Sequence, residues 1–236
     1  MEASLIDAAL RQGLIRAAGE LRLEIHSDQT NLLFQYLSLL QRWNSVYNLT
    51  SVREPTQMLT LHLADCMALI KPLRRHLGEC TAARLLDVGS GAGLPGVVIA
   101  TMNRQISVTC VDAVGKKAAF VRQVAGELAL GNLVAEHARI ESLAAAPFDV
   151  ITSRAFASLH DFVRLTRVHL APGGVWLAMK GKAPEAEIAG LPGDIDVFHV
   201  EQLTVPGLDA ERCLVWLKCK PCATAIAPKL AHESGA

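Results

Sequence analysis

A glycine-rich stretch, LLDVGSGAGLPG at residues 85–96, carries the clearest chemical signal in the chain. Glycines at a turn between a strand and a helix let the backbone approach a ligand closely, and the helix N-terminus offers free N–H groups. Residues 91–96 fit the G-x-G-x-x-G of nicotinamide and flavin sites, whereas residues 87–93 fit the D-x-G-x-G-x-G of S-adenosylmethionine (SAM) sites. The loop therefore predicts a nucleoside-containing cofactor of one of these two kinds.

The residues around the glycines favour SAM. Asp87 would repel a pyrophosphate, whereas the sulfonium and amino groups of SAM are cationic. Pro95 lacks the N–H group that a phosphate would use at this turn. Asp112 lies 19 residues after Gly93, at the end of the next predicted strand, and suits the ribose diol that both cofactors carry. The residues predicted for a SAM site on these grounds are Asp87, Gly89, Gly91, Gly93 and Asp112.

The elements that must position this loop change character along the chain. Apolar residues recur at helical spacing in three segments, which predicts three helices. The first is 3–24, the second has Ser27 or Asp28 as its N-cap, and the third runs from Pro55 to Ile70. Short apolar runs then alternate with helical segments, which is typical of a mostly parallel sheet covered by helices. The predicted strands are 84–88, 106–112, 133–134, 148–152 and 175–179; helices follow from about 95, through 116–128 and at 159–170, and a turn lies at 171–174.

The last part of the chain breaks this alternation. Residues 196–205 and 212–218 are both strand-like with no room for a helix between them, so they should form an antiparallel hairpin. We therefore predict an α/β fold of the Rossmann-like class I SAM-dependent methyltransferase type, a mostly parallel sheet ending in an antiparallel hairpin with an N-terminal helical extension. The expected extension is 1–75, packed on a catalytic domain at 76–220, and 221–236 should be a disordered tail.

Composition narrows the class of protein further. The 236 residues are 51% hydrophobic and 5% aromatic, with zero formal net charge, so no overall field indicates a general nucleic-acid binder. No apolar run approaches the ~20 residues that span a bilayer, and the first residues lack a signal-peptide pattern. We expect a cytoplasmic protein without a membrane partner. Cys219 and Cys222 form a lone C-x-x-C, and no metal site is expected.

Six stretches occur in an order that resembles the RsmG (GidB) family of bacterial methyltransferases. They are RWNSVYNLTSV (42–52), LHLADCMAL (61–69), LLDVGSGAGLPG (85–96), VDAVGKKAAFVRQV (111–124), ITSRAFASL (151–159) and MKG (179–181). The resemblance covers about residues 25–220, and Cys66 and Ala113 stand where the family usually has serine. It implies a 16S ribosomal RNA (guanine-N7) methyltransferase that uses SAM. It also implies cofactor contacts by Gly89, Leu94, Ile140, Glu141 and Arg154.

Basic residues near the predicted site are candidates for binding the RNA. Lys116 and Lys117 open a helix, where they oppose the helix dipole, and Arg122 lies further along the same helix. Lys180 follows the last parallel strand, and Arg53 lies in a polar link between helices. The expected partner is 16S ribosomal RNA or the small ribosomal subunit, and the protein is expected to be a monomer. His62 and Asp65 are spaced to share a helix face, where we expect them to form a hydrogen-bonded pair.

N7 of guanine already carries an in-plane lone pair, so we expect no catalytic residue of the general-base type. Two other classes of function stay open from the sequence. One is a SAM-dependent methyltransferase acting on another RNA or a small molecule, and the other is a non-catalytic ribosome-assembly binding protein. A nicotinamide oxidoreductase is disfavoured by Asp87, Pro95 and the terminal hairpin.

Overall fold

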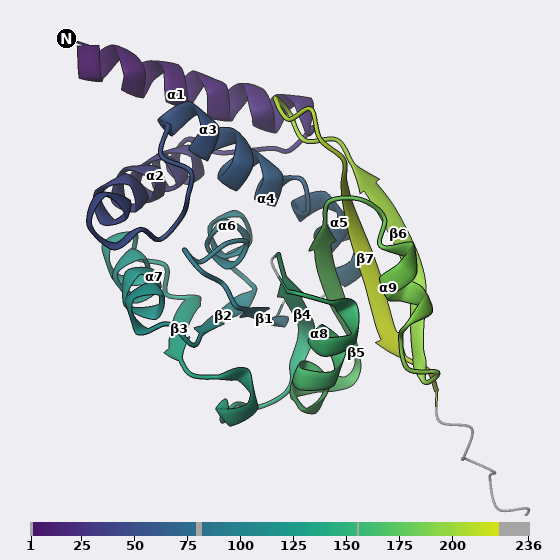
Figure 1. Cartoon of the computed structure of the whole chain (residues 1–236). Coiled ribbons are helices and arrows are strands. Elements are labelled where there is room, and N and C mark those ends of the chain that lie inside the picture. The colour runs from purple at the N-terminus through teal and green to yellow at the C-terminus, as the bar shows by residue number, and fades with distance from the viewer. Residues whose placement is uncertain (1, 79–81, 155, 222–236) are drawn as a thin grey trace, which may run out of the picture.

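A computed structural model describes residues 2–78, 82–154 and 156–221, and its centre is one mixed sheet (Figure 1). The strand order is β3-β2-β1-β4-β5-β7-β6. Neighbouring strands from β3 to β5 pair in parallel, while β7 pairs antiparallel with both β5 and β6. The predicted parallel sheet with a terminal hairpin is confirmed. The strands are β1 Arg84–Val88, β2 Ser107–Asp112, β3 Leu133–His137, β4 Phe148–Ser153, β5 Leu170–Lys180, β6 Ile195–Leu203 and β7 Arg212–Cys219.

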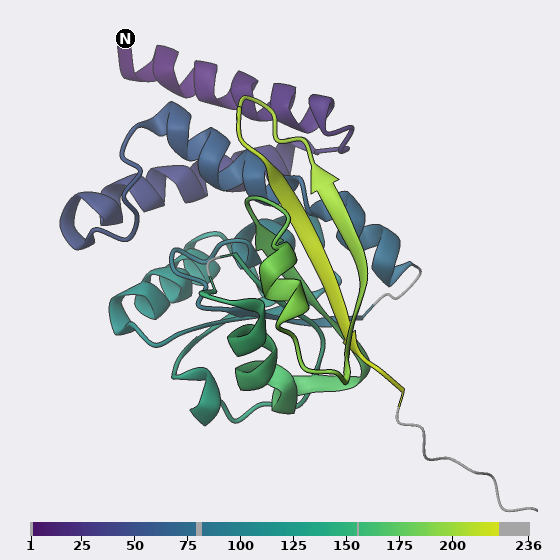
Figure 2. The ribbon, with the colours of Figure 1, turned by 45° about the vertical axis from the view of Figure 1, so that its right-hand side comes forward.

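Helices cover both faces of this sheet, and the N-terminal ones lie together on one side (Figure 2). The α-helices are α1 Glu2–Glu20, α2 Ser27–Tyr47, α3 Pro55–Met58, α4 Asp65–Met67, α5 Ile70–Leu77, α6 Gly96–Met102, α7 Gly115–Glu127, α8 Leu159–Thr166 and α9 Glu185–Ala189. Two 3₁₀ turns follow β3 and α8, at Ile140–Ser142 and Arg167–His169. None of the described helices is long and apolar enough to cross a membrane.

The third predicted helix is confirmed at its start but not as one regular helix. Pro55 occupies its first turn, where a missing N–H costs nothing. Residues Leu59–Ala64 then form a π-helix, and α4 and α5 continue the chain to Leu77. The wider π turn shifts later side chains away from the faces that a 3.6-residue period gives them. Apolar periodicity alone does not reveal such an insertion.

Two other local predictions were wrong. The expected turn at 171–174 lies inside β5, whose pairing with β4 shifts register between Phe148 and Val150. Gly173 has φ +79°, so the glycine allows an irregular strand to continue where a turn was expected. The short helix α9 also lies in a segment for which no helix was predicted. The expected tail falls almost entirely on residues 222–236, outside the described part of the chain.

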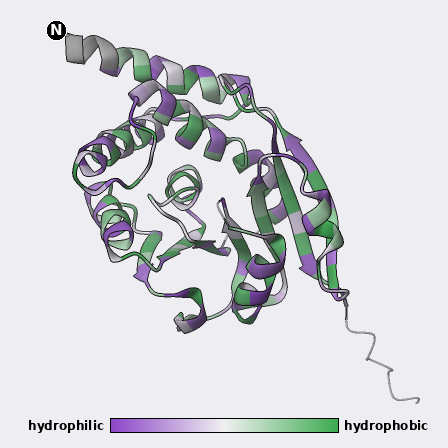
Figure 3. Ribbon diagram, viewed as in Figure 1, coloured by the Kyte–Doolittle hydropathy of each residue, from purple (hydrophilic) through white to green (hydrophobic). Residues whose placement is uncertain are grey.

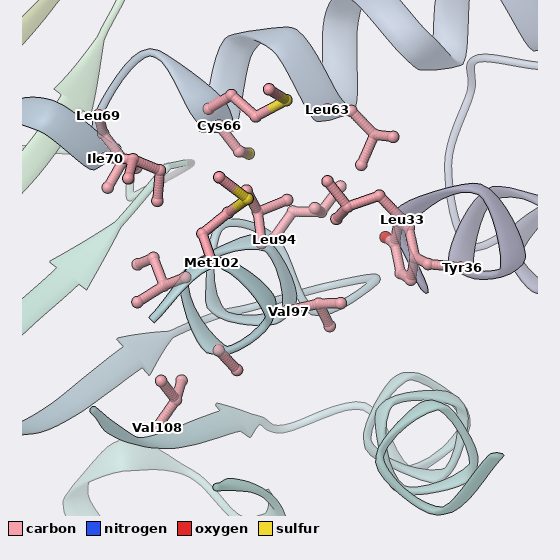
Figure 4. Close-up of a cluster of buried hydrophobic side chains, with 14 of the residues drawn as sticks. Leu33, Tyr36, Leu63, Cys66, Leu69, Ile70, Leu94, Val97, Met102 and Val108 are labelled. Atoms are coloured by element: carbon pink, nitrogen blue, oxygen red, sulfur yellow. The ribbon is translucent and has the colours of Figure 1, made fainter. Parts of the chain in front are cut away.

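The sheet separates two apolar clusters. Leu85 and Val108 point to the face covered by α6, α7 and the N-terminal helices, whereas Leu86 and Val111 point to the face covered by α8. This alternation follows from the two-residue period of strands. In Figure 3 the strands β5 and β7 are largely hydrophobic, while the helices alternate in polarity. Figure 4 shows side chains from α2, the π-helix, α6 and β2 meeting in the first cluster, so the N-terminal helices share a core with the sheet.

The arrangement also sets the place of a ligand site. Strands β1, β2, β4 and β5 are parallel, so their carboxyl ends meet at one edge of the sheet. The N-termini of α6 and α7 begin near that edge, directly after β1 and β2. Ligands of open α/β sheets bind outside this edge, where the connections leave room.

Candidate active site

The glycine loop between β1 and α6 bends through left-handed backbone conformations. Gly89, Gly91 and Gly93 have φ values of +65°, +58° and +82°. A Cβ atom on Gly89 or Gly91 would meet nothing within 4 Å, so both residues border open space. A Cβ on Gly93 would instead lie 2.7 Å from Val97 and 2.9 Å from Val121. Gly89 and Gly91 therefore leave room for a ligand, and Gly93 lets the loop pack on α6 and α7.

Asp87 lies at the base of this loop and is fully buried. Its Oδ2 accepts a hydrogen bond from the N–H of Gly96 at 2.8 Å, while its Oδ1 is buried without a partner among the described residues. Burial is the main cause that raises the pKa of Asp87 to about 7. A Cβ on Gly96 would lie 2.3 Å from Sγ of Cys110, so this glycine lets α6 approach the sheet.

Asp112 ties the end of β2 to the glycine loop. Its Oδ2 accepts from the N–H of Gly91 at 2.9 Å and its Oδ1 accepts from the N–H of Val114 at 2.8 Å. Each carboxylate oxygen has a further lone pair, so Asp112 keeps the capacity to accept from a ribose hydroxyl. The carboxylate is therefore oriented by the backbone before any ligand arrives.

A first cavity, here called the loop cavity, has a volume of about 190 Å³. It brings together Gly89 and Asp112 with Ile140 and Glu141, which lie in the 3₁₀ turn after β3. Its lining residues are Val88, Gly89, Val111, Asp112, Ala113, Ala138, Arg139, Ile140, Glu141, Phe156 and Leu165. Apolar walls beside one oriented carboxylate suit an adenosine, whose base is apolar on its faces and whose ribose carries a diol. The open space at Gly89 and the unpartnered Oδ1 of Asp87 also fit a cationic, SAM-like group.

Leu94 differs from the other residues predicted for the cofactor. Its side chain is buried in the first apolar cluster, beside Val97 and Leu63 (Figure 4). It does not line the loop cavity. Any contact of Leu94 with a ligand at the loop would therefore come from its backbone.

A second cavity, here called the arginine cavity, has a volume of about 370 Å³ and lies where the π-helix, β5 and β7 meet. It contains Arg154 and Lys180, which were predicted from different motifs. Its lining residues are Leu61, His62, Asp65, Arg154, Met179, Lys180, Gly181 and Arg212. Arg154 borders this cavity, and Phe156, two residues later in the chain, borders the loop cavity.

Ion pairs organise the arginine cavity. Oδ1 of Asp65 lies 2.9 Å from Nε of Arg212, and Oδ2 of Asp65 lies 3.6 Å from Nη1 of Arg154. The side chain of Asp65 is 5% exposed, and each arginine side chain is 26% exposed. Nζ of Lys180 lies 2.8 Å from Oε2 of Glu187. The cavity is therefore walled by charged groups whose positions are set by their partners.

The expected pair between His62 and Asp65 was wrong. His62 bonds through Nε2 to Oγ1 of Thr50 at 3.0 Å, while Asp65 faces the two arginines. The π-helix explains the difference, because its wider turn separates residues that an α-helix would place on one face. Burial is the main cause that lowers the pKa of His62 to about 4, so this histidine is neutral near pH 7.

Arg212 was not among the residues predicted from the sequence. It opens β7, far along the chain from Asp65, and no motif or spacing marks it. Only the pairing of β7 with β5 brings it beside Lys180, since Lys180 and Cys213 are opposite each other in the sheet. A strand-edge arginine next to a buried apolar run is an ordinary surface pattern in sequence.

The remaining basic candidates do not enter either cavity. Nζ of Lys116 donates to the backbone carbonyl of Tyr47 at 2.7 Å, at the end of α2. Arg53 donates to Oδ1 of Asn48 at 3.0 Å, and Arg122 donates to the carbonyl of Ala135 at 3.3 Å beside the outer strand β3. Lys117 lies on the first turn of α7. These residues are dispersed along α7 and the α2–α3 link, apart from Lys180.

Metal chemistry has no cluster to support it in residues 2–78, 82–154 and 156–221. No group of three or more His, Cys, Asp or Glu side chains that could hold an ion occurs there. Cys219 is exposed, and its sequence neighbour in the C-x-x-C, Cys222, lies outside the described residues.

Comparison with known families gives one match over most of the chain. The family profile described as "GidB: rRNA small subunit methyltransferase G" matches residues 29–215. A ribosomal RNA small subunit methyltransferase G of Methylibium petroleiphilum is 62% identical over 90% of this chain and 96% of its own. The protein of that description from Leptothrix cholodnii is 58% identical over 91% of this chain and 98% of its own.

Solved structures show the same fold at low sequence identity. TrmN from Thermus thermophilus is 19% identical, with a TM-score of 0.51 over 64% of this chain and 48% of its own. The glycopeptide N-methyltransferase MtfA, complexed with sinefungin, is 12% identical, with a TM-score of 0.54 over 66% of this chain and 86% of its own. The sheet and its flanking helices are thus those of class I SAM-dependent methyltransferases.

Proposed function

The chain belongs to the GidB family, rRNA small subunit methyltransferase G, and from this membership we propose that it methylates N7 of a guanine in the decoding-region loop of 16S ribosomal RNA. Members of the family are SAM-dependent rRNA methyltransferases, and the chain is accordingly an enzyme of this class. The observation that carries the finer proposal is the loop cavity beside a charged cavity on the same sheet edge. One is suited to an adenosyl group and the other to a polyanion.

SAM would occupy the loop cavity with its ribose on Asp112 and its base near Ile140 and Glu141. The methionine part would pass over Gly89 and Gly91, where nothing occupies the space of a Cβ. Its amino group would be attracted by Asp87, and its carboxylate by Arg154. Gly93 would keep the loop in shape, and Leu94 would contribute backbone only.

When bound, SAM supplies an electrophilic methyl group on a sulfonium. That methyl group would pass to the in-plane lone pair of guanine N7, and the sulfur would keep the electron pair of the bond that breaks. No proton moves, so the protein needs to align N7 with the methyl group and exclude water rather than supply a base. The lining of the two cavities agrees with this requirement, because the one histidine there, His62, is held by Thr50.

Charge determines where the RNA phosphates and the methylated base should lie. The purine becomes cationic on methylation, so cations pressed against N7 would slow the reaction. Arg53, Lys116, Lys117, Arg122 and Lys180 are proposed to hold phosphates around the site instead, since phosphate contacts position RNA without reading its sequence. The proposed substrate is 16S RNA, free or within the small subunit. We also propose that the enzyme acts as a monomer in the cytoplasm.

Mass spectrometry of 16S RNA tests the proposal. Incubating unmodified small subunits or free 16S RNA with the protein and SAM should add one N7-methylguanine in the decoding-region loop. The variant Gly89→Arg should abolish SAM binding in titration calorimetry and should add no methyl group. Methylation of a small-molecule acceptor alone, or RNA binding without turnover, would overturn the proposal in favour of the other two classes of function.

A further inference from the structure

The lining of the arginine cavity has an excess of positive charge. Arg154 and Arg212 face Asp65, and Lys180 pairs with Glu187, so three cations and two carboxylates leave an excess of one positive charge. At about 370 Å³ the cavity is within the ~300–1,000 Å³ of typical ligand pockets. Over the whole chain the formal positive and negative charges are equal in number, so the net formal charge is zero. A local excess of this kind indicates an anionic ligand.

Asp65 holds the two arginines together. It comes from α4, whereas Arg154 follows β4 and Arg212 opens β7. Each of its two oxygens faces a different guanidinium, at 2.9 Å and 3.6 Å. The carboxylate is almost fully buried, so both contacts lie in a poorly solvated place where charge interactions are stronger than in water. Three segments that are remote in sequence are thereby joined at one point.

The donors that remain favour a phosphate over a nucleobase. Arg212 uses Nε toward Asp65 and Nη1 toward the carbonyl of Glu211, and Arg154 uses Nη1 toward Leu61 and Asp65. Within the described residues, Nη2 of each arginine makes no protein hydrogen bond. The N–H edge of guanine requires acceptors, but the one lining carboxylate already faces both arginines. Free guanidinium donors match the oxygens of a phosphodiester.

We propose that the arginine cavity binds a backbone phosphodiester of the RNA next to the methylated nucleotide. Arg212 donates to its oxygens, Lys180 and Arg154 add positive charge, and Asp65 is the positioning residue that orients the guanidinium of Arg212. This assignment rests on the proposed function. Arg154 lines the arginine cavity and Phe156, two residues later in the chain, lines the loop cavity, so a phosphate in the arginine cavity would lie close to a base that faces a methyl donor in the loop cavity. The target nucleotide would be held by its backbone while N7 faces the methyl group.

The first test uses Arg212→Gln in steady-state methylation of small subunits. Losing a charged donor to phosphate should raise the KM for RNA by about 10- to 100-fold and leave the SAM Kd from calorimetry unchanged. The slope of log KM against log salt should also fall by about 1. Arg75→Gln is the matched control, because Arg75 pairs with Glu201 at 2.6 Å but does not line the cavity. It should behave as wild type in all three measurements.

A second test separates the positioning role of Asp65 from a purely structural one. Asp65→Asn should raise the KM for RNA. Asp65→Glu keeps the charge, so its KM for RNA should be much closer to the wild-type value. Asp65→Asn should lower the salt slope as Arg212→Gln does, and the double variant should lower it no further. Thermal melting identifies variants that fail to fold, and Arg212→Lys then serves as a milder change that keeps the charge without the planar fork.

Three outcomes distinguish a failure of the proposed function from a failure of the phosphate assignment. If the wild-type protein adds no methyl group to the small subunit, the proposed function is wrong. If it methylates normally but Arg212→Gln keeps the wild-type KM and salt slope, only the phosphate assignment is overturned. A loss of SAM affinity in Arg212→Gln, equal to the loss of activity, would likewise reject the cavity as an RNA site.

Discussion

Arg154 lines the arginine cavity and Phe156 lines the loop cavity, but the two cavities are built in different ways. Five segments line the loop cavity, and backbone N–H groups orient the carboxylates of Asp87 and Asp112 beside it. The arginine cavity is assembled from four separate segments, and side-chain ion pairs hold it in place. The glycine loop is proposed to position SAM, a small cofactor whose chemical structure never varies. Long cationic side chains suit an RNA backbone, which is recognised by charge more than by shape.

The two regions should respond to acid in opposite directions, which is the largest effect we expect. Burial raises the pKa of Asp87 to about 7, so the stability that this group contributes is present below its ordinary pKa and is lost as pH rises toward 7. Burial lowers the pKa of His62 to about 4, so its contribution is present above its ordinary pKa and is lost as pH falls toward 4. Each contribution is on the order of 2–4 kcal/mol, and in the wild type they offset each other.

Urea unfolding at pH 5 and pH 7.5 measures these contributions in two variants. Asp87→Asn should lose stability on acidification more steeply than wild type, because the His62 contribution remains. His62→Gln should become more stable on acidification. Cys110, Asp112 and Arg154 also face Asp87, so the comparison uses differences between variants rather than absolute slopes. Equal pH dependence in both variants would contradict the assigned environments.

Close packing under the loop cavity should make Gly96→Ala strongly destabilising. A Cβ there would lie 2.3 Å from Sγ of Cys110 and 3.0 Å from Oδ2 of Asp87, both in the buried sheet. We expect the free energy of unfolding to fall by about 2 kcal/mol, since overpacking forces α6 away from the strands. Gly126→Ala on α7 is the control, because its Cβ would meet nothing within 4 Å. Urea denaturation that gives the same midpoint for both variants would show that α6 does not depend on this contact.

Gly89→Ala should separate backbone strain from ligand contact. Its φ of +65° makes any side chain costly by about 1–2 kcal/mol, and the added methyl enters the space proposed for SAM. We expect the SAM Kd to rise about tenfold in calorimetry, equivalent to about 1.4 kcal/mol. Gly173→Ala also places a side chain at positive φ, +79°, with open space around it, but lies in β5 away from both cavities. It should lose stability without losing SAM affinity, and a matching loss of affinity would reject the loop as the contact.

The difference in construction between the two cavities explains which of their residues could be predicted from the sequence. The glycine loop, the acid after β2 and the order of the parallel strands are local patterns, so the loop of Gly89 and Gly91 and the place of Asp112 at the end of β2 could be predicted from the sequence alone, while their contact with a cofactor stays a prediction. The antiparallel hairpin also followed from local apolar runs. The role of Asp87 was less accessible, because its bond to Gly96 depends on how closely α6 approaches the sheet.

The arginine cavity was largely hidden from sequence reasoning. Lys180 and Arg154 could be named as cations at the sheet edge, but their partners could not. The π-helix moved Asp65 away from His62, and the pairing of β7 with β5 brought in Arg212. Side-chain ion pairs between distant segments leave no periodic pattern, so the residues of this cavity come together only in the folded chain.

The smallest effect should come from the cations outside the two cavities. Nζ of Lys116 is bonded to the carbonyl of Tyr47 on an exposed surface, where a contact with phosphate is worth at most about 1 kcal/mol. Lys116→Met should therefore raise the KM for the small subunit by no more than about fivefold and leave the SAM Kd unchanged. Steady-state kinetics at two salt concentrations checks this, with Lys71→Met on α5 as a control for removing one charge. If Lys116→Met raised the KM for the small subunit more than Arg212→Gln does, the RNA backbone would be held mainly beside the loop cavity. The arginine cavity would then not be the main site that binds the RNA backbone.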